Sequence, residues 1–215
     1  PAASCVTGQL LGVAPGFLLP RFHSLGIAGF QIPLGDTHVG MIIPGDRYDR
    51  LSVATYATHD HKPIRALWDE TPDHPDTDTA RPAQATLEKI AEFAGLLGTN
   101  SGTAASFVRH SLGEGRSPPN HSGADSKPPF PDRLDFEKDF YPAIIEALFS
   151  CNSWVAMVMI TDLLARKYRF NVPGTKANLN WTRRMQRSIA KLRSSRKERK
   201  RMHLIGELLK KTGRV

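Results

Sequence analysis

The amino-acid sequence predicts an α/β fold built from parallel strands, and three observations carry this prediction. Short apolar or β-branched runs alternate with helix-like segments along most of the 215 residues, which is the pattern of βαβ units. The run Trp154–Ile160 is continuously apolar, as expected for a strand buried on both faces of a parallel sheet. The segment Ser52–His61 begins with β-branched and aromatic residues and ends in three ionisable ones, shortly before a helix.

Four segments are expected to form the parallel strands. In chain order they are Ser4–Thr7, Gly26–Pro33, Ser52–His61 and Trp154–Ile160. Their expected ends lie near Gln9, Pro33, Asp60 and Asp162. Asp60 and Asp162 should then lie on the same side of the sheet, because the carboxyl ends of parallel strands meet at one edge.

Four further segments are expected to be helices. Ala83–Leu97 is the clearest of them, because its apolar residues recur at helical spacing and form one stripe. Prolines stand at the entry of several of these segments, a position that suits proline because the first backbone N–H of a helix has no partner in any case. In chain order the expected helices are Val13–Leu25, Pro63–Glu70, Ala83–Leu97 and Pro142–Phe149.

Two regions break the alternation. Ser111–Asp132 is rich in Pro, Gly and Ser and is predicted to be a mobile insertion or lid. From Trp181 onward the tail is predicted to form two amphipathic helices that pack on the body, so that residues 1–178 form one domain and residues 179–215 an appendage. The two apolar stripes of this tail are Trp181, Met185, Ile189 and Leu192, and then Met202, Ile205 and Leu209.

The composition restricts the class of protein. A hydrophobic fraction of 40% and a charged fraction of 23% are ordinary for a globular domain, and no apolar run reaches the length of a membrane span. No membrane partner is therefore expected. Cys5 and Cys151 are too few for a disulfide scaffold, which favours a cytoplasmic location. Because the chain starts at Pro1 rather than Met and a strand-like segment follows at once, this start is expected to be a point of truncation rather than a native N-terminus.

The net charge of +8 is carried by the tail. Lys176–Val215 holds 14 of the 29 Lys and Arg residues but two of the 21 acidic residues. A basic stretch of this kind can bind nucleic-acid phosphates, and a nucleic-acid-binding module is therefore one alternative function. The basic residues interleave with an apolar stripe, however, and no nucleic-acid-binding motif accompanies them. A surface helix docked on the body is the favoured interpretation, and nucleic acid is an unlikely partner.

The residues that follow two of the expected strands are the candidate site. His59, Asp60 and His61 follow one strand and Asp162 follows another, which places two carboxylates at the carboxyl ends of strands. An aspartate at a strand-to-helix turn is often only a helix N-cap, and the pattern alone favours capping over catalysis. His59 and His61 could face one metal ion, but no third ligand is arranged near them in the sequence, so no metal site is expected.

Three stretches of the sequence resemble one family, the 4-alpha-glucanotransferases, also called amylomaltases or disproportionating enzymes. "LGVAPGFLLPRFHSLGIAGFQIP" resembles the part that follows the fifth barrel strand of this family, and "LSVATYATHDHKPIRALWDE" resembles a later strand-to-helix segment. "NSWVAMVMITDLLARKYRFNVPGTKANLNWTRRM" resembles the last barrel strand and the segment after it. The combination of "THD" with "FNVPGT…NW" is specific, and only the predicted insertion is left unmatched.

This resemblance implies strands five to eight of a (β/α)8 barrel and a retaining transfer of α-1,4-glucan segments between maltooligosaccharides. It implies that Asp60 is the carboxylate after strand seven, which binds sugar hydroxyls and stabilises the transition state. His59, Asn171 in the "RFNVPGT" loop and Asp162 are expected to contact the substrate. The resemblance implies neither a cofactor nor a catalytic metal.

The chain departs from the family at catalytic positions. Gln9 stands where the family has its acid/base Glu, and an amide cannot protonate a leaving oxygen. Leu10 stands where an Asp is expected, and the nucleophilic Asp of strand four would precede Pro1. The chain is therefore expected to be inactive alone and to need the missing N-terminal half of the barrel as a partner. A non-catalytic glucan-binding remnant is the alternative.

The three tryptophans, Trp68, Trp154 and Trp181, could each stack on the face of a sugar. Their spacing along helices and strands favours packing in the core instead. Cys151 is expected to be a small buried residue.

Overall fold

The structure is a computed structural model, and it describes residues 7–8, 16–34, 37–38, 41–71, 80–97, 134–175 and 180–215. Gln9, Leu10, the predicted start of the first helix at Val13 and the predicted insertion at Ser111–Asp132 lie outside the described residues.

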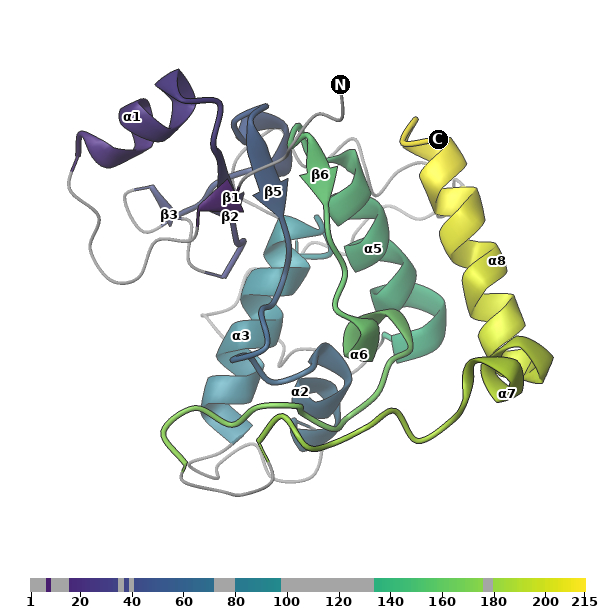
Figure 1. Ribbon diagram of the computed structural model, residues 1–215. Coiled ribbons are helices and arrows are strands. Elements are labelled where there is room, and N and C mark those ends of the chain that lie inside the picture. Colours follow the sequence, from purple (N-terminus) through teal and green to yellow (C-terminus); the bar gives the residue numbers. More distant parts are fainter. Residues whose placement is uncertain are drawn as a thin grey trace, which may run out of the picture.

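Within the described residues, four short parallel strands form one sheet in the order of the chain (Figure 1). They are β1 (Thr7–Gly8), β2 (Ala28–Gln31), β5 (Ser52–Ala54) and β6 (Val155–Ala156). A separate antiparallel pair consists of β3 (Thr37–His38) and β4 (Met41–Ile42). The α/β fold and the parallel arrangement of the four predicted strands are therefore confirmed.

The last strand is shorter than predicted. The sequence predicts one buried strand over Trp154–Ile160, whereas only β6 pairs with β5, and both of its residues are half-buried. Trp154 is 49% exposed and Met157 is 45% exposed. The length of β6 follows from its partner, because β5 itself is only three residues long. The chain then turns into a short helix, α6 (Ile160–Leu163).

The helices of the body lie close to their predicted positions. They are α1 (Leu18–Ser24), α2 (Ile64–Glu70), α3 (Ala80–Phe93) and α5 (Tyr141–Ser150), with a π-helical turn η2 (Phe136–Phe140) leading into α5. The helix α3 ends before the predicted Leu97 because Gly95 has a φ of 70°, a backbone conformation that favours glycine. The N–H of Leu96 then bonds to the carbonyl of Ala91 at 2.8 Å, which closes the helix end.

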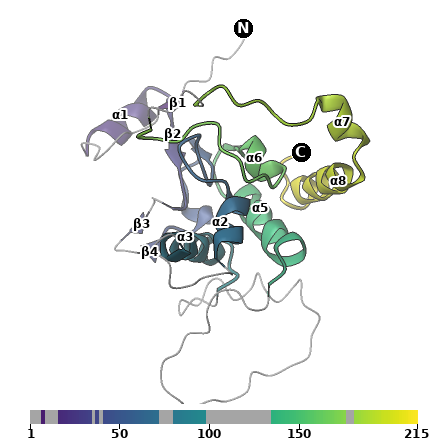
Figure 2. The ribbon, with the colours of Figure 1, turned by 90° about the horizontal axis from the view of Figure 1, so that it is seen from below.

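The core lies between the sheet and helices α2, α3 and α5. Figures 1 and 2 show α3 and α5 side by side, and their buried residues belong to one apolar cluster with Ala54 of β5. Tyr56, just beyond β5, donates its hydroxyl to the carbonyl of Ile144 in α5 at 2.8 Å. The apolar centre of the cluster is formed by Leu87, Ile90, Phe140, Ile144, Ile145 and Leu148. This core fixes the strands from which the site residues emerge.

The tail is helical over less of its length than predicted. It contains α7 (Ile189–Ser194) and α8 (Arg196–Lys211), whereas residues 181–187 are not helical. The first predicted stripe does not pack, since Trp181 is 64% exposed and Ile189 is 72% exposed. The helix α8 packs on α5, and its residues Ile205 and Leu208 are buried. No helix in the described ranges is both long and apolar enough to cross a membrane.

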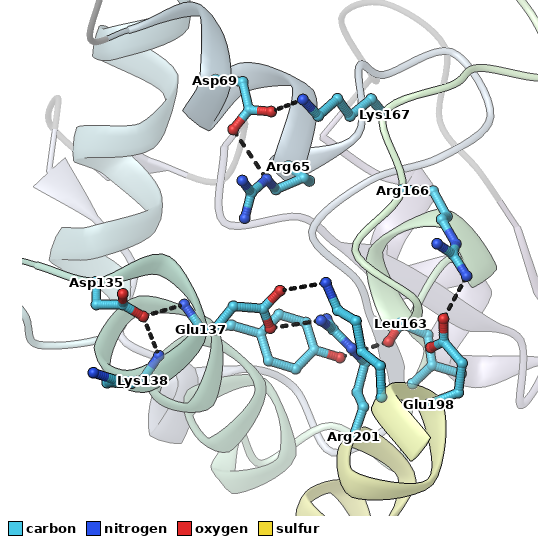
Figure 3. A network of polar contacts seen from close by, with 12 residues as sticks. Arg65, Asp69, Asp135, Glu137, Lys138, Leu163, Arg166, Lys167, Glu198 and Arg201 are labelled. Carbon is cyan, nitrogen blue, oxygen red and sulfur yellow. Dashed lines mark hydrogen bonds and ion pairs between the residues drawn. The ribbon is translucent and has the colours of Figure 1, made fainter. Parts of the chain in front are cut away.

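Ion pairs fasten α8 to the body (Figure 3). Arg201 is 5% exposed; its guanidinium lies 2.5 Å from the Glu137 carboxylate and 4.5 Å from the centre of the Tyr141 ring. Lys197 also pairs with Glu137, at 3.2 Å, and Lys211 pairs with Glu146 of α5 at 2.6 Å. Acidic side chains of the body thus pair with Lys197, Arg201 and Lys211 of the tail.

Candidate functional site

The connection from β5 to α2 carries the residues that the sequence singles out. The Nδ1 atom of His61 accepts the backbone N–H of Thr58 at 3.1 Å and lies 2.9 Å from the Thr58 hydroxyl. A ring nitrogen that accepts a backbone N–H carries no proton. Burial also lowers the pKa of His61, although Asp60 acts in the opposite direction. His61 is therefore a neutral residue that closes the turn, and it leaves His59 and Asp60 facing outward.

Asp60 is the centre of a cluster of polar contacts at the carboxyl end of β5. Its side chain is 46% exposed. The Asn171 amide donates to Asp60 Oδ1 at 2.6 Å, and His59 Nε2 lies 3.4 Å from Asp60 Oδ2. Arg169 donates to the backbone carbonyl of Asp60 at 2.5 Å. Three of the predicted residues, His59, Asp60 and Asn171, are thus brought together although Asn171 is 111 residues away from Asp60.

The segment that supplies Asn171 is held at its start by two ion pairs (Figure 3). Arg166 lies 2.5 Å from the carboxylate of Glu198 in α8, and Glu198 is 2% exposed. Lys167 pairs with Asp69 of α2, which also binds Arg65 at 3.0 Å. The tail helix and α2 therefore both position the segment that leads to Arg169 and Asn171.

Asp162 lies beyond the carboxyl end of β6, on the same side of the sheet as Asp60, as predicted. Its surroundings differ, however, because Asp162 is 6% exposed and its Oδ1 accepts the N–H of Ile64 at 2.8 Å. Burial raises the pKa of Asp162 to about 7, although the bond from Ile64 acts in the opposite direction. The carboxylate thus caps the first turn of α2 from another segment and faces the protein interior.

The tryptophans differ from one another. Trp68 packs against Phe136 and Phe140 with ring centres 5.3 Å and 4.8 Å away, so the interpretation as a core residue is confirmed for it. The interpretation as a core residue is wrong for Trp154 and Trp181, because both are exposed. The ring of Trp181 lies 4.9 Å from the ring of His59. Arg169 is therefore a neighbour of the site that the sequence did not identify, and Trp181 is one that the sequence assigned to the core instead; both depend on contacts between distant segments.

The opposite end of the sheet has a hollow of about 640 Å³. Its lining includes Arg50, which precedes β5, and Asn152 and Trp154, which precede β6, so it lies at the amino ends of these strands. The guanidinium of Arg214 donates there to the carbonyls of Phe149 and Cys151, and Cys151 is buried as predicted. Across the described part of the chain, no group of three or more His, Cys, Asp or Glu residues is arranged to hold a metal ion.

A partly exposed carboxylate with an amide and an imidazole beside it can exchange hydrogen bonds with a ligand that carries several hydroxyl groups. The exposed indole next to it offers an apolar face to the same ligand. The position at the carboxyl ends of parallel strands is where α/β proteins place their binding and catalytic residues. The fold and the cluster together define an α/β protein with a carboxylate-centred candidate site.

Comparison with protein families assigns the chain more narrowly. Residues 4–190 match the family described as 4-alpha-glucanotransferase, and the chain belongs to this family. A 4-alpha-glucanotransferase of Chlamydia trachomatis is 24% identical over 203 residues, and that of Chlamydia muridarum is 27% identical over 198 residues. These matches cover 88% and 86% of this chain but 30% and 29% of the relatives. The chain therefore spans less than a third of the length of the relatives it matches.

Solved structures show the same fold. The amylomaltase of Corynebacterium glutamicum superposes with a TM-score of 0.64 over 95% of this chain and 28% of its own, at 17% identity. The amylomaltase of Streptococcus agalactiae in complex with acarbose superposes with a TM-score of 0.55 over 96% of this chain and 31% of its own, at 16% identity. Both matches place the fold of this chain within that of amylomaltases.

Proposed function

We propose that this chain supplies strands five to eight of the (β/α)8 barrel of a 4-alpha-glucanotransferase. The proposed strands are β1, β2, β5 and β6, which are parallel and follow one another in chain order. Family membership over residues 4–190 and the amylomaltase fold support this assignment. Residues 1–178 then belong to the barrel and residues 179–215 to a helical appendage. A buried free thiol at Cys151 and the few cysteines favour a reducing compartment, the cytoplasm.

The proposed substrate is an α-1,4-glucan, and the contact between Asp60 and Asn171 is the observation that carries this proposal. Two motifs of the family, "THD" and "FNVPGT", meet there although they lie far apart in the sequence. In a retaining transfer, Asp60 would accept hydrogen bonds from sugar hydroxyls and stabilise positive charge at the anomeric carbon. His59 and Asn171 would bind further hydroxyls of the same sugar.

Two catalytic groups that a glucan transfer needs are not supplied by this chain. A retaining transfer needs an attacking carboxylate and a general acid. The family places the first before strand five and the second at the position of Gln9, which cannot donate a proton to the leaving oxygen. The chain alone is therefore proposed to bind glucan without transferring it. We assign Asp162 to the cap of α2 rather than to substrate, because its carboxylate is buried.

Titration of the chain with maltoheptaose, followed by NMR, tests this function. The amide signals of Asp60 and Asn171 are expected to shift, and Asp60→Asn is expected to weaken binding roughly tenfold because a charge-assisted hydrogen bond is lost. The matched control is Asp46→Asn, which changes an exposed aspartate in η1 (Gly45–Arg47), on the amino side of β5. Equal affinities of the unaltered chain and both variants would contradict the assignment of Asp60.

A further inference from the structure

Trp181 is a large aromatic residue that the fold leaves exposed beside Asp60. Its side chain is 64% exposed, although most of the other large aromatic residues that the structure describes are buried or half-buried. The indole ring lies 4.9 Å from the ring of His59, and the two planes are inclined by 55°. His59 in turn lies 3.4 Å from the Asp60 carboxylate. The aromatic ring, the imidazole and the carboxylate therefore form one continuous outer surface.

The backbone of Trp181 adopts a conformation that side chains rarely take. Its φ is 64°, in the left-handed region that favours glycine, so the local conformation costs free energy. Hydrogen bonds between segments hold it there. The N–H of Trp181 donates to the carbonyl of Phe170 at 2.8 Å, and the Asn180 side chain bonds both the N–H and the carbonyl of Val172, at 3.0 Å and 3.2 Å. Burial of the indole does not offset this cost, because most of the ring remains in solvent.

The support of Trp181 extends to the tail helix and to α2. The segment that carries Phe170, Asn171 and Val172 begins at the ion pairs of Arg166 with Glu198 and of Lys167 with Asp69 (Figure 3). One segment therefore holds Asn171 against Asp60 and also fixes the backbone of Trp181. The position of the indole relative to the carboxylate is set by the fold before any ligand binds.

We propose that Trp181 is a stacking platform for a glucose ring of a glucan bound at Asp60. A glucose ring has faces of C–H groups and a rim of hydroxyls, so it matches an apolar ring face combined with hydrogen-bonding groups at the edge. Trp181 supplies the apolar face, and Asp60 and Asn171 supply the polar edge. The proposal rests on the proposed function, since it takes the ligand to be an α-1,4-glucan, and it adds a residue that determines how the glucan is oriented.

The test is NMR titration of the full chain with maltoheptaose. The indole N–H signal of Trp181 is expected to shift during the titration, while that of Trp154 stays in place. Trp181→Ala is expected to raise the dissociation constant roughly tenfold or more, and Trp181→Phe, which keeps a ring, to raise it less than about threefold. Trp154→Ala is the matched control, because it removes another exposed indole at the amino end of β6. It should bind as the unaltered chain does.

Each outcome decides between the platform and the wider function. If Asp60→Asn weakens binding and Trp181→Ala does not, the platform is wrong and the function of Asp60 stands. If Trp181→Ala weakens binding and Asp60→Asn does not, the stacking role of Trp181 is supported and the binding role of Asp60 is contradicted. A chain that binds no maltoheptaose overturns both. If Trp181→Ala fails to fold, the indole signal of the unaltered chain and the affinity of Trp181→Phe decide the question, and an unshifted signal refutes the platform.

Discussion

Replacing Gln9 by glutamate in a completed barrel is expected to raise the rate of glucan transfer by about 10²–10⁴-fold, the contribution of general acid catalysis. The barrel is completed by fusing the part of the Chlamydia muridarum relative that precedes the matched region in front of Pro1. This part would supply the attacking carboxylate, while Gln9 still could not protonate the leaving sugar oxygen. The substitution Gln9→Glu restores the missing proton donor. The release of glucose and maltopentaose from maltotriose measures the rate.

The matched control for this hybrid is Gln186→Glu, which makes the same chemical change at an exposed position of the tail. Its rate should remain that of the hybrid that keeps Gln9. The chain alone, with or without Gln9→Glu, should transfer nothing because it lacks the nucleophile. If the hybrid that keeps Gln9 were as fast as the hybrid with Gln9→Glu, position 9 would not hold the acid.

The second large effect concerns Asp162 and the pH dependence of stability. The folded state keeps the proton of this carboxyl up to about pH 7, whereas the ordinary pKa is 3.8. The unfolded chain therefore releases the proton first, and the free energy of unfolding falls as the pH rises from about 4 to 7. A shift of this size corresponds to a loss on the order of 4 kcal/mol. Above pH 7 the loss is complete, and the buried carboxylate remains charged.

Asp162→Asn removes this titration and keeps an oxygen that can accept the N–H of Ile64. Relative to the unaltered chain, the variant should gain stability on the order of 4 kcal/mol between pH 4 and pH 8. Urea denaturation at several pH values measures the difference. Asp46→Asn, at an exposed carboxylate, should show no such gain. Parallel stability curves for the unaltered chain and Asp162→Asn would show that the carboxyl of Asp162 is not perturbed by burial.

Local sequence patterns predict the parts of this fold that depend on neighbouring residues. The stripe of α3 and the proline before α2 are visible in the sequence because helical periodicity and helix entry are local properties. The length of β6 is not visible, since it depends on a partner strand about 100 residues away that pairs over few positions. The absence of helix over residues 181–187 is not visible in the sequence either. The hydrogen bond from Trp181 to Phe170 goes with a backbone conformation of Trp181 outside the helical region.

In the candidate site, too, local features could be predicted from the sequence and contacts between distant segments could not. Asp60 and Asp162 both follow strands, but Asp60 is partly exposed and Asp162 is buried. The difference arises because Asp162 meets the N-terminus of α2, 98 residues away in sequence. Asn171 could be predicted only from the resemblance to a family. Arg169 was not predicted, and Trp181 was assigned to the core, because their contacts with Asp60 and His59 join separate segments.

The central claim is that Asp60 is the carboxylate that stabilises the transition state of glucan transfer, and adding Asp60→Asn to the Gln9→Glu hybrid tests it most directly. The double variant is expected to lower the transfer rate from maltotriose by about 10²–10³-fold, because the neutral amide no longer stabilises positive charge at the anomeric carbon. Its melting temperature should stay close to that of the Gln9→Glu hybrid, since the Asp60 side chain is 46% exposed. A folded double variant that transfers glucan as fast as the Gln9→Glu hybrid would contradict the claim.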